Sequence, residues 1–304
     1  MAEDISIGQV PTIEKVAESR AAVASGRRRQ FTRRTESVGA HVIMIITVII
    51  AIFPLLTIIS TSFKIPADVF TPNVQLIPAH PTLANYQYVL AGEFPTWLLN
   101  SIKVSLLTTL VGVALAAPAA YAFSRWDFLG KQGLLISFLV TQMFPAPLLL
   151  VPLYLLFVNL NLLDNVPALV IVYATTALPF SVWMLKNFFD SVPKELDEAA
   201  RVDGLGPFRT FWQIVLPLTI PGVAVVAFFN FMAAWNEFLW AFTFLTSESN
   251  WTLAIGIKQY VHAFGADWGY LTAASVLVTI PVLIAFLWAQ RYLISGLTGG
   301  SVKG

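Results

Sequence analysis

The chain has 304 residues, of which 57% are hydrophobic and only 12% charged, and its formal net charge at pH 7 is +1. Typical soluble domains carry about 25% charged residues, so this composition excludes an ordinary soluble protein and predicts a polytopic membrane protein. Cysteine is absent, which excludes a disulfide framework, a thiolate metal site and a thiol nucleophile. The histidines, His41, His80 and His262, lie far apart in sequence, so we expect no metal site in this chain alone.

The first 38 residues lack the apolar core of a cleavable signal peptide, so we expect them to remain on the mature protein. Residues 27–34 contain five arginines. Beside a first span, such a run is far more often a topology determinant or a contact for anionic lipid than a nucleic-acid patch. We therefore predict a cytoplasmic N-terminal tail over 1–38 and no nucleic-acid partner.

Six segments of the chain are long and apolar enough to cross a bilayer, which requires about 20 residues each. Each segment must be helical, because an isolated span has to satisfy its own backbone hydrogen bonds in lipid. Prolines, which kink or break helices, occur in the third, fourth and fifth segments. The sequence thus predicts an all-α integral membrane protein with a six-helix domain over 39–294. The predicted spans are 39–61, 98–124, 133–158, 166–188, 214–246 and 270–294.

Lysine and arginine determine the orientation, because cytoplasmic segments carry an excess of both. With the N-terminal tail in the cytoplasm, 15 of the 18 basic residues fall on the cytoplasmic side. Both termini are then cytoplasmic, including a C-terminal tail over 295–304. The polar segment at about 189–213 is cytoplasmic as well, and the segment 247–269 lies outside.

The polar segment after the fourth span predicts a short, rigid helix. Pro193 suits the first turn, where a backbone N–H is not needed, and acidic residues follow it. Gly204 is placed to end the helix, because glycine adopts the left-handed cap conformation without steric cost. Four residues at helical spacing predict one small, flat side: Leu196, Ala199, Ala200 and Asp203. Three aromatic residues are expected to anchor the segment against the bundle: Phe208, Phe211 and Trp212.

The chain lacks the sequence of a nucleotide-binding protein. Its one Gly-Lys pair, Gly130-Lys131, is followed by Gln132 and lacks the upstream glycine of a phosphate loop. We also find no nucleophile, base and orienting group in workable proximity. We therefore expect a non-catalytic chain with no cofactor of its own. An ion-coupled secondary transporter stays an alternative, mildly disfavoured by the lack of an internal repeat.

Residues at fixed spacing in the polar segment carry a resemblance to a known family: Glu198-Ala199-Ala200, Gly204, Ile214 and Leu216-Pro217. This pattern resembles the EAA loop of membrane subunits in binding-protein-dependent ABC importers. Residues 235–238, 252–260 and 290–304 resemble carbohydrate permeases of the maltose-transporter type, and the last of these most resembles its MalG type of subunit. The resemblance implies a type I ABC importer permease fold in the inner or plasma membrane of a prokaryote.

The same resemblance implies the substrate and the partners. The substrate is a sugar such as maltose, a maltodextrin or trehalose, and a non-sugar solute is the alternative. The partners are a second permease (MalF-like), a dimer of ATPases (MalK-like) that binds ATP and Mg, an extracytoplasmic solute-binding protein and membrane lipid.

Three groups of residues acquire roles from the resemblance. The EAA loop grips the ATPase through Glu198, Ala199, Ala200, Asp203, Gly204, Leu205 and Gly206. The tail inserts between the ATPases through Gly299, Gly300, Ser301, Val302 and Lys303, although a disordered end is the alternative. The outer segment probes the sugar pocket of the docked binding protein through Gly256, Ile257, Lys258, Gln259 and Tyr260.

The fifth predicted span carries polar residues at depth, with Asn230, Ala234 and Glu237 on one helical face. Such residues usually face a cavity or a neighbouring helix, and both interpretations stay open. Sugar hydroxyls need neutral donors and acceptors, and sugar rings need aromatic faces, which Asn236 and Trp235 offer. The candidate pathway residues are Asn230, Trp235, Asn236 and Glu237.

Overall fold

The structure is a computed structural model that describes residues 39–71, 75–262 and 265–298. The chain divides into two compact units, Met1–Thr57 and Ile58–Gly304. In the first unit, the described residues belong to the helix Gly39–Ser62. This helix agrees with the first predicted span, and nearly all of its apolar side chains in that unit are exposed in the single chain.

Four helices in the described part of the chain are each long and apolar enough to cross a membrane: Gly39–Ser62, α4 (Phe94–Arg125), α7 (Val166–Asp190) and α14 (Trp268–Thr298). Two bent pairs also qualify if each pair counts as one span: α5 (Lys131–Met143) with α6 (Ala146–Asn159), and Pro207–Leu218 with α11 (Ile220–Trp235). The predicted helical class is confirmed, and the predicted six spans correspond to four straight helices and two bent pairs.

The predicted third span, 133–158, folds as two helices, in agreement with the expectation that its prolines kink or break it. α5 and α6 meet at 97°, and the break lies at Phe144 and Pro145. Proline lacks a backbone N–H and favours extended backbone in the residue before it, and Phe144 has φ −74° and ψ 124°. An apolar run reveals the length of a segment but not a bend inside it.

The predicted fifth span, 214–246, is divided as well. Three short elements come before α11: α9 (Pro207–Thr210), a π-helical turn η1 (Phe211–Val215) and α10 (Leu216–Leu218). The predicted span begins within η1. The segment formed by the three elements makes an angle of 80° with α11. After α11 ends, a separate helix, α12 (Leu239–Phe244), begins. The carboxylate of Glu237 lies in the gap and accepts hydrogen bonds from the backbone N–H groups of Trp240 (3.0 Å) and Ala241 (3.3 Å).

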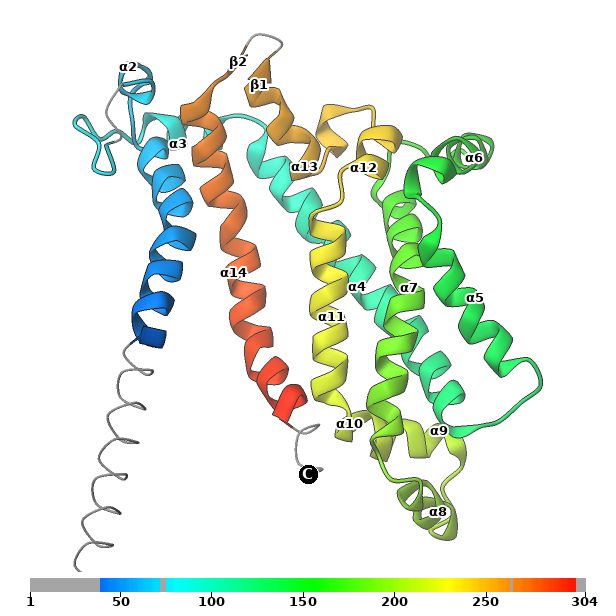
Figure 1. The fold of residues 1–304 in the computed structure, drawn as a ribbon. Helices are drawn as coiled ribbons and strands as arrows, with labels where there is room; N and C mark the ends of the chain where they lie inside the picture. The colour runs from blue at the N-terminus through cyan, green and yellow to red at the C-terminus, as the bar shows by residue number, and fades with distance from the viewer. Residues whose placement is uncertain (1–38, 72–74, 263–264, 299–304) are drawn as a thin grey trace, which may run out of the picture. The chain divides into compact units, whose positions relative to one another are not determined.

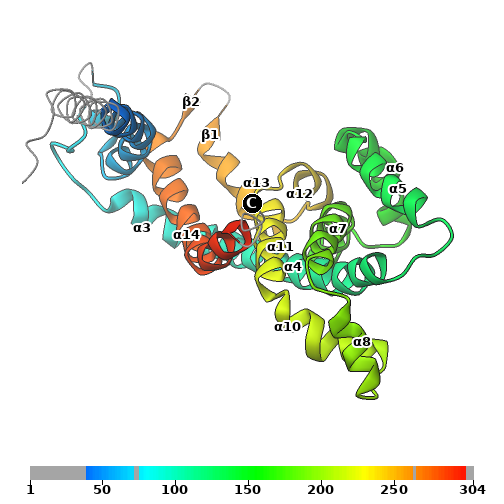
Figure 2. The ribbon, with the colours of Figure 1, turned by 60° about the horizontal axis from the view of Figure 1, so that its bottom comes forward.

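In the second unit, α4 packs along α7 and also contacts α11 (Figure 1). One side of α4 carries small buried residues at helical spacing, which allow neighbouring helices to approach closely. These residues are Ser101, Ser105, Thr108, Gly112, Ala116 and Ala120. Gly112 is needed for this approach, since a Cβ there would lie 2.9 Å from Asn230 Nδ2 on α11. Both views show α5 on the side of α7 and α14 on the side of α11 (Figures 1 and 2).

Short elements of the second unit gather at two opposite ends (Figure 1). One end holds α8 (Glu195–Val202) and α9, which also project together in Figure 2. The other end holds α2 (Pro66–Val69), α3 (Ala84–Ala91), α6, α12 and α13 (Leu253–Gly256). The segments 189–213 and 247–269, which the charge distribution assigns to opposite sides of the membrane, therefore lie at opposite ends. Which end is cytoplasmic stays a prediction.

The end opposite α8 includes two 3-10 turns, η2 (Glu248–Asn250) and η3 (Ile257–Tyr260). A pair of two-residue antiparallel strands follows, β1 (Val261–His262) and β2 (Gly265–Ala266), in which Val261 pairs with Ala266. Strands this short leave no alternating pattern in the sequence, and we did not predict them.

Asp164, in the loop between α6 and α7, holds this end together. Its carboxylate accepts hydrogen bonds from the backbone N–H groups of Thr246 and Ser247, both at 2.9 Å, and from the Ser247 hydroxyl. Partial burial alone would raise the pKa of Asp164, but these hydrogen bonds to the charged form outweigh it and lower the pKa to about 2.

Candidate functional site

The polar segment folds as the predicted short helix, α8. Acidic residues occupy its first turn, where they complement the positive end of the helix dipole. Gly204 has φ +82°, which confirms the predicted left-handed cap. The backbone N–H of Leu205 donates to Ala200 O (2.9 Å), and that of Gly204 donates to Arg201 O (3.1 Å). This pair of hydrogen bonds is a Schellman motif, which satisfies carbonyl groups at the helix end.

The residues predicted to couple to an ATPase fall into two sets. Glu198, Ala199, Asp203 and Gly206 are exposed, Gly204 is exposed at the cap and Leu205 is half-buried. Ala200, by contrast, is only 2% exposed, so it faces the protein's own interior. The prediction of one flat outer side that includes Ala200 is therefore wrong. The small Ala200 side chain instead lets α8 lie close to the rest of the chain.

The predicted aromatic anchor is correct for one of its three residues. Phe211 is 3% exposed and contacts the rings of Tyr121 and Phe189. Phe208 and Trp212 are 75% and 53% exposed, so the prediction is wrong for them. These two residues are four positions apart on the outer side of the same segment, while Phe211 points inward.

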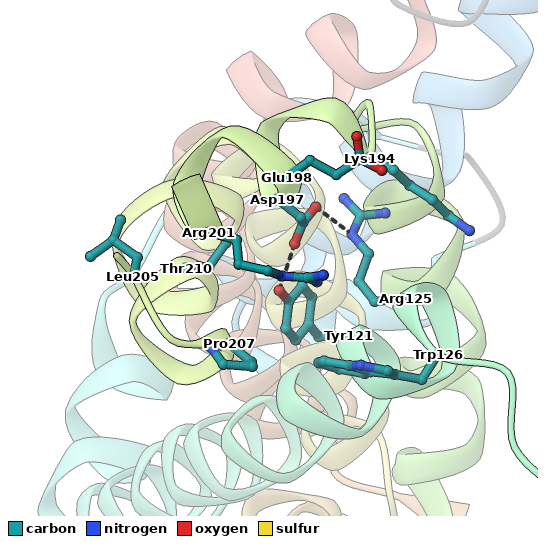
Figure 3. Close-up of a pocket in the computed structure, with 10 residues that line it drawn as sticks. All are labelled: Tyr121, Arg125, Trp126, Lys194, Asp197, Glu198, Arg201, Leu205, Pro207 and Thr210. Carbon is teal, nitrogen blue, oxygen red and sulfur yellow. Dashed lines mark hydrogen bonds and ion pairs between the residues drawn. The ribbon is translucent and has the colours of Figure 1, made fainter. Parts of the chain in front are cut away.

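A buried ion pair fixes α8 to the end of α4 (Figure 3). Arg125 Nε lies 2.8 Å from Asp197 Oδ2, and the two side chains are 5% and 13% exposed. The Tyr121 hydroxyl donates to Asp197 Oδ1 at 2.7 Å. Tyr121 and Arg125 are four residues apart on α4, so one carboxylate binds two successive turns of that helix.

Arg125 also binds the end of α7. Its Nη1 donates to Phe189 O (2.9 Å) and its Nη2 to Val192 O (3.1 Å). Sequence reasoning used Arg125 only in the charge count and did not consider Tyr121. A basic residue at the last turn of a span, with an acidic helix after a later span, was the available signal.

A cavity of about 160 Å³ lies between α8, α9 and the end of α4 (Figure 3). The Asp197, Arg125 and Tyr121 side chains meet at this cavity, with Trp126 and Arg201 beside them. The base of α8 is therefore polar and charged, whereas its remaining support, around Phe211, is apolar.

The predicted probe segment at the other end is largely packed. Gly256 is buried against Trp97, whose ring would lie 2.1 Å from a Cβ at that position, and Tyr260 is 8% exposed. Ile257 is half-buried, so only Lys258 and Gln259 are exposed. Lys258 Nζ lies 4.2 Å from the centroid of the Phe242 ring. The prediction of a continuous exposed probe from 256 to 260 is therefore wrong at both of its ends.

All four candidate pathway residues are buried or hydrogen-bonded within the chain. Asn230 is 1% exposed and its Oδ1 accepts from Ser181 Oγ at 2.9 Å. Glu237 accepts from the Tyr173 hydroxyl at 2.7 Å, in addition to capping α12. Trp235 is 6% exposed and stacks on Phe231. Asn236 is exposed, and its Nδ2 donates to Met232 O at 2.8 Å.

A groove of about 480 Å³ lies beside Asn230, between α5, α7 and α11. Its exposed polar side chains are Gln142 and Thr176, and its exposed aromatic rings are Phe180 and Phe229. Gln142 Nε2 donates to Thr176 O at 2.9 Å. Sequence reasoning missed Gln142 and Thr176, because they lie on different helices and their proximity depends on how α5 packs beside α7.

The predicted tail contacts at 299–303 lie outside the described residues. Within the described ranges, no group of three or more His, Asp or Glu side chains has an arrangement that could hold a metal ion.

A bundle of straight and bent spans with a short helical peg at one end defines a class of proteins, the membrane subunits of solute importers. The chain belongs to the family described as "Binding-protein-dependent transport system inner membrane component", whose model matches residues 109–299. It is therefore an inner-membrane protein of a transport system that depends on a binding protein.

Individual proteins agree with this family. The chain is 36% identical over 275 residues to the "Inner membrane ABC transporter permease protein YcjP" of Escherichia coli (strain K12), covering 90% of this chain and 98% of that protein. It is 37% identical over 292 residues to the "Maltose/maltodextrin transport system permease protein MalG" of Yersinia pestis, covering 90% and 95%. A chain from the crystal structure of a bacterial ABC transporter involved in alginate import matches with a TM-score of 0.76 and 25% identity, covering 85% of this chain and 96% of that one.

Proposed function

We propose that this chain is one of two permease subunits of an ATP-driven importer for a neutral sugar. Its partners are a second permease resembling MalF, a dimer of ATPases resembling MalK, and an extracytoplasmic binding protein that delivers the sugar. The observation that carries the proposal is α8, whose outer side is exposed and whose base is fixed to α4 by the buried ion pair of Asp197 and Arg125. The relatives described as maltose and maltodextrin permeases support the sugar.

In this proposal, α8 is the contact through which ATP drives transport. ATP and Mg bind to the partner ATPases, and each ATPase receives one α8-type helix in a cleft. Closure of the ATPase dimer draws the two helices together and opens the pathway outward, and hydrolysis resets it. Glu198, Ala199 and Asp203 supply the exposed contact surface, while Ala200, Gly204, Leu205 and Gly206 maintain its shape.

Two further contacts complete the proposed assembly. Residues Gly299, Gly300, Ser301, Val302 and Lys303 extend the chain toward the ATPases. At the other end, the exposed Lys258 and Gln259 reach the docked binding protein. The buried Gly256 and Tyr260 hold them in place.

The groove between α5, α7 and α11 supports a neutral substrate. Its lining contains an amide, a hydroxyl and aromatic rings but no charged side chain. Exposed polar groups on spanning helices are costly against lipid, so Gln142 and Thr176 fit a surface that meets water, solute or the partner permease. An acidic polysaccharide, the substrate named for the alginate importer, finds no cation in this groove.

Reconstitution of the complete transporter in proteoliposomes tests the proposal. The binding protein is added with maltose, maltotriose, trehalose or an alginate oligosaccharide, and ATP hydrolysis and sugar uptake are measured. We expect a neutral sugar to stimulate both. Failure of all four compounds removes the carbohydrate assignment, and uptake driven by protons or sodium through this chain alone contradicts the importer.

A further inference from the structure

We infer that Asp197, Arg125 and Tyr121 form a clamp that transmits movement of α8 directly into α4. The inference rests on the proposed function and adds a route to it. The chain itself connects α8 only to α7 on one side and to α9 on the other. α4 ends far earlier in the sequence, so the clamp is its direct connection to α8.

The clamp holds one carboxylate by both of its oxygen atoms. Asp197 Oδ2 pairs with Arg125 Nε at 2.8 Å, while Oδ1 accepts from the Tyr121 hydroxyl at 2.7 Å. The two partners project from successive turns of α4, so the carboxylate cannot turn about its own axis without losing one of them. Figure 3 shows the three side chains converging from the two helices. A displacement of α8 therefore pulls on two points of α4.

Arg125 joins a third element to the clamp. With Nε on Asp197, its other two nitrogens donate to carbonyl groups at Phe189 and Val192, at and beyond the end of α7. Nη1 and Nη2 thus donate hydrogen bonds while Nε makes the ion pair by distance alone, and the side chain is 5% exposed. Separating a buried ion pair leaves uncompensated charges, which is costly. The pair of Asp197 and Arg125 therefore resists separation of α8 from α4.

A second ion pair nearby, between Lys131 and Asp127, is exposed and does not join separate helices. Lys131 Nζ lies 2.8 Å from Asp127 Oδ1, but the two residues are four positions apart in the same segment, and the Asp127 side chain is 92% exposed. Exposed pairs of this kind contribute little, because solvent competes for both charges. The pair connects no separate helices, which makes Asp127 a matched control for Asp197.

The contact between α4 and α11 connects the clamp to the groove. At Gly112, α4 contacts Asn230 of α11 so closely that a methyl group would lie 2.9 Å from Nδ2. Asn230 in turn lines the groove that contains Gln142 and Thr176. The clamp thus connects the exposed face of α8, by way of α4, to the groove.

The test uses Asp197→Asn, Tyr121→Phe and Arg125→Lys in the complete transporter, with radiolabelled maltose or whichever sugar of the panel the wild type imports. The readout is sugar imported per ATP hydrolysed, together with the amount of ATPase that co-purifies. We expect Asp197→Asn to retain ATPase and hydrolysis but to lower sugar per ATP about tenfold, which corresponds to about 1.4 kcal/mol of coupling. Asp127→Asn should match the wild type.

A second readout follows the two helices directly. The chain has no cysteine, so spin labels at Lys103→Cys on α4 and Glu195→Cys on α8 report a single distance. ATP binding should leave this distance unchanged in the otherwise wild-type chain and should change it when Asp197→Asn is added.

Two results overturn the clamp. One is a wild-type ratio of sugar to ATP in Asp197→Asn and Tyr121→Phe with the complex assembled. The other is loss of the co-purifying ATPase while the amount of the chain in the membrane is normal. This would mean that the three residues only build the docking surface. Failure of the proposed function is distinguishable, because then the wild type also imports none of the sugars.

Discussion

At the residue scale, Gly204 shows how one position sets the length of α8. Its φ of +82° is a conformation that costs little for glycine and more for any residue with a Cβ. A Cβ at this position would meet no other group within 4 Å, so the cost of a side chain is conformational and not steric. Sequence alone predicted this glycine, because a helix cap is a local feature. The partnership of Asp197 with Arg125 was not predictable in the same way, since it joins residues far apart in sequence.

Gly204→Ala should therefore fray the end of α8 without disturbing the bundle. We expect a local loss of about 1 kcal/mol, from the strain of a Cβ in the left-handed region. Hydrogen exchange of the amides at 199–205 measures it, and stimulation of ATPase by the binding protein should fall in parallel. Gly133→Ala adds the same methyl group within α5, again with nothing within 4 Å, and should not slow or speed exchange in α8. Unchanged exchange in Gly204→Ala would contradict the cap's role.

At the element scale, local patterns predicted which segments are helical and named prolines that could break them, but not which of those prolines produce a sharp bend. The first, second, fourth and sixth predicted spans correspond to single helices, although α4, α7 and α14 each contain an internal proline. The third and fifth are broken at Pro145 and near Pro221, where tertiary packing decides between a kink and a sharp turn. The outward positions of Phe208 and Trp212 were also missed, because aromatic character alone does not tell which members of a short segment pack inward.

The loop before α7 offers a pH-dependent test at this scale. Because the pKa of Asp164 is lowered to about 2, its charge stabilises the loop at pH values above about 4, its unfolded pKa, and this contribution is lost as the pH falls toward 2. The backbone amides of Thr246 and Ser247 should thus be equally protected from hydrogen exchange at pH 7 and pH 5, after correction for intrinsic rates. Below pH 4 their protection should fall. Asp164→Asn should reduce this protection at pH 7, whereas Asp127→Asn, at the other end, should not. Equal protection in Asp164→Asn would show that the charge is not needed.

At the scale of the whole molecule, exposed apolar surface in the single chain indicates what the assembly covers. The family and its fold were predictable, because the EAA spacing and the distribution of charged residues can be read directly from the sequence. The groove was not, because Gln142, Thr176 and Phe229 come together only when α5 packs beside α7 and α11. The same holds for the clamp, in which three elements meet at one arginine.

Phe208 and Trp212 should be covered by the partner ATPase, since both lie next to α8 and are largely exposed in the single chain. Replacing both with alanine is expected to lower ATPase co-purification while the chain's amount in the membrane is unchanged. Leu129→Ala, at a fully exposed position in the loop between α4 and α5, is the control. Normal co-purification in the double variant would assign this aromatic surface to lipid instead.

Gln142→Leu tests the groove in the assembled transporter. Loss of one neutral hydrogen bond costs about 0.5 to 1.5 kcal/mol, so we expect the sugar concentration for half-maximal uptake to rise by up to about tenfold with ATPase assembly intact. Gln132→Leu, at the exposed beginning of the same helix, should leave it unchanged. An unaltered uptake curve in Gln142→Leu would exclude contact between this amide and the sugar.

The shortness of α5 has a consequence for the thickness of the permeability barrier. Thirteen helical residues extend about 20 Å, whereas a hydrocarbon core is about 30 Å thick. α5 alone is therefore only about two thirds as long as such a core is thick, and the last carbonyl groups of a helix have no intrahelical partners. Because lipid offers no hydrogen-bond partners, protein groups or water have to satisfy this helix end, next to the 97° bend into α6. Beside α5, the helical wall between the two sides of the membrane is therefore about two thirds of a hydrocarbon core in height.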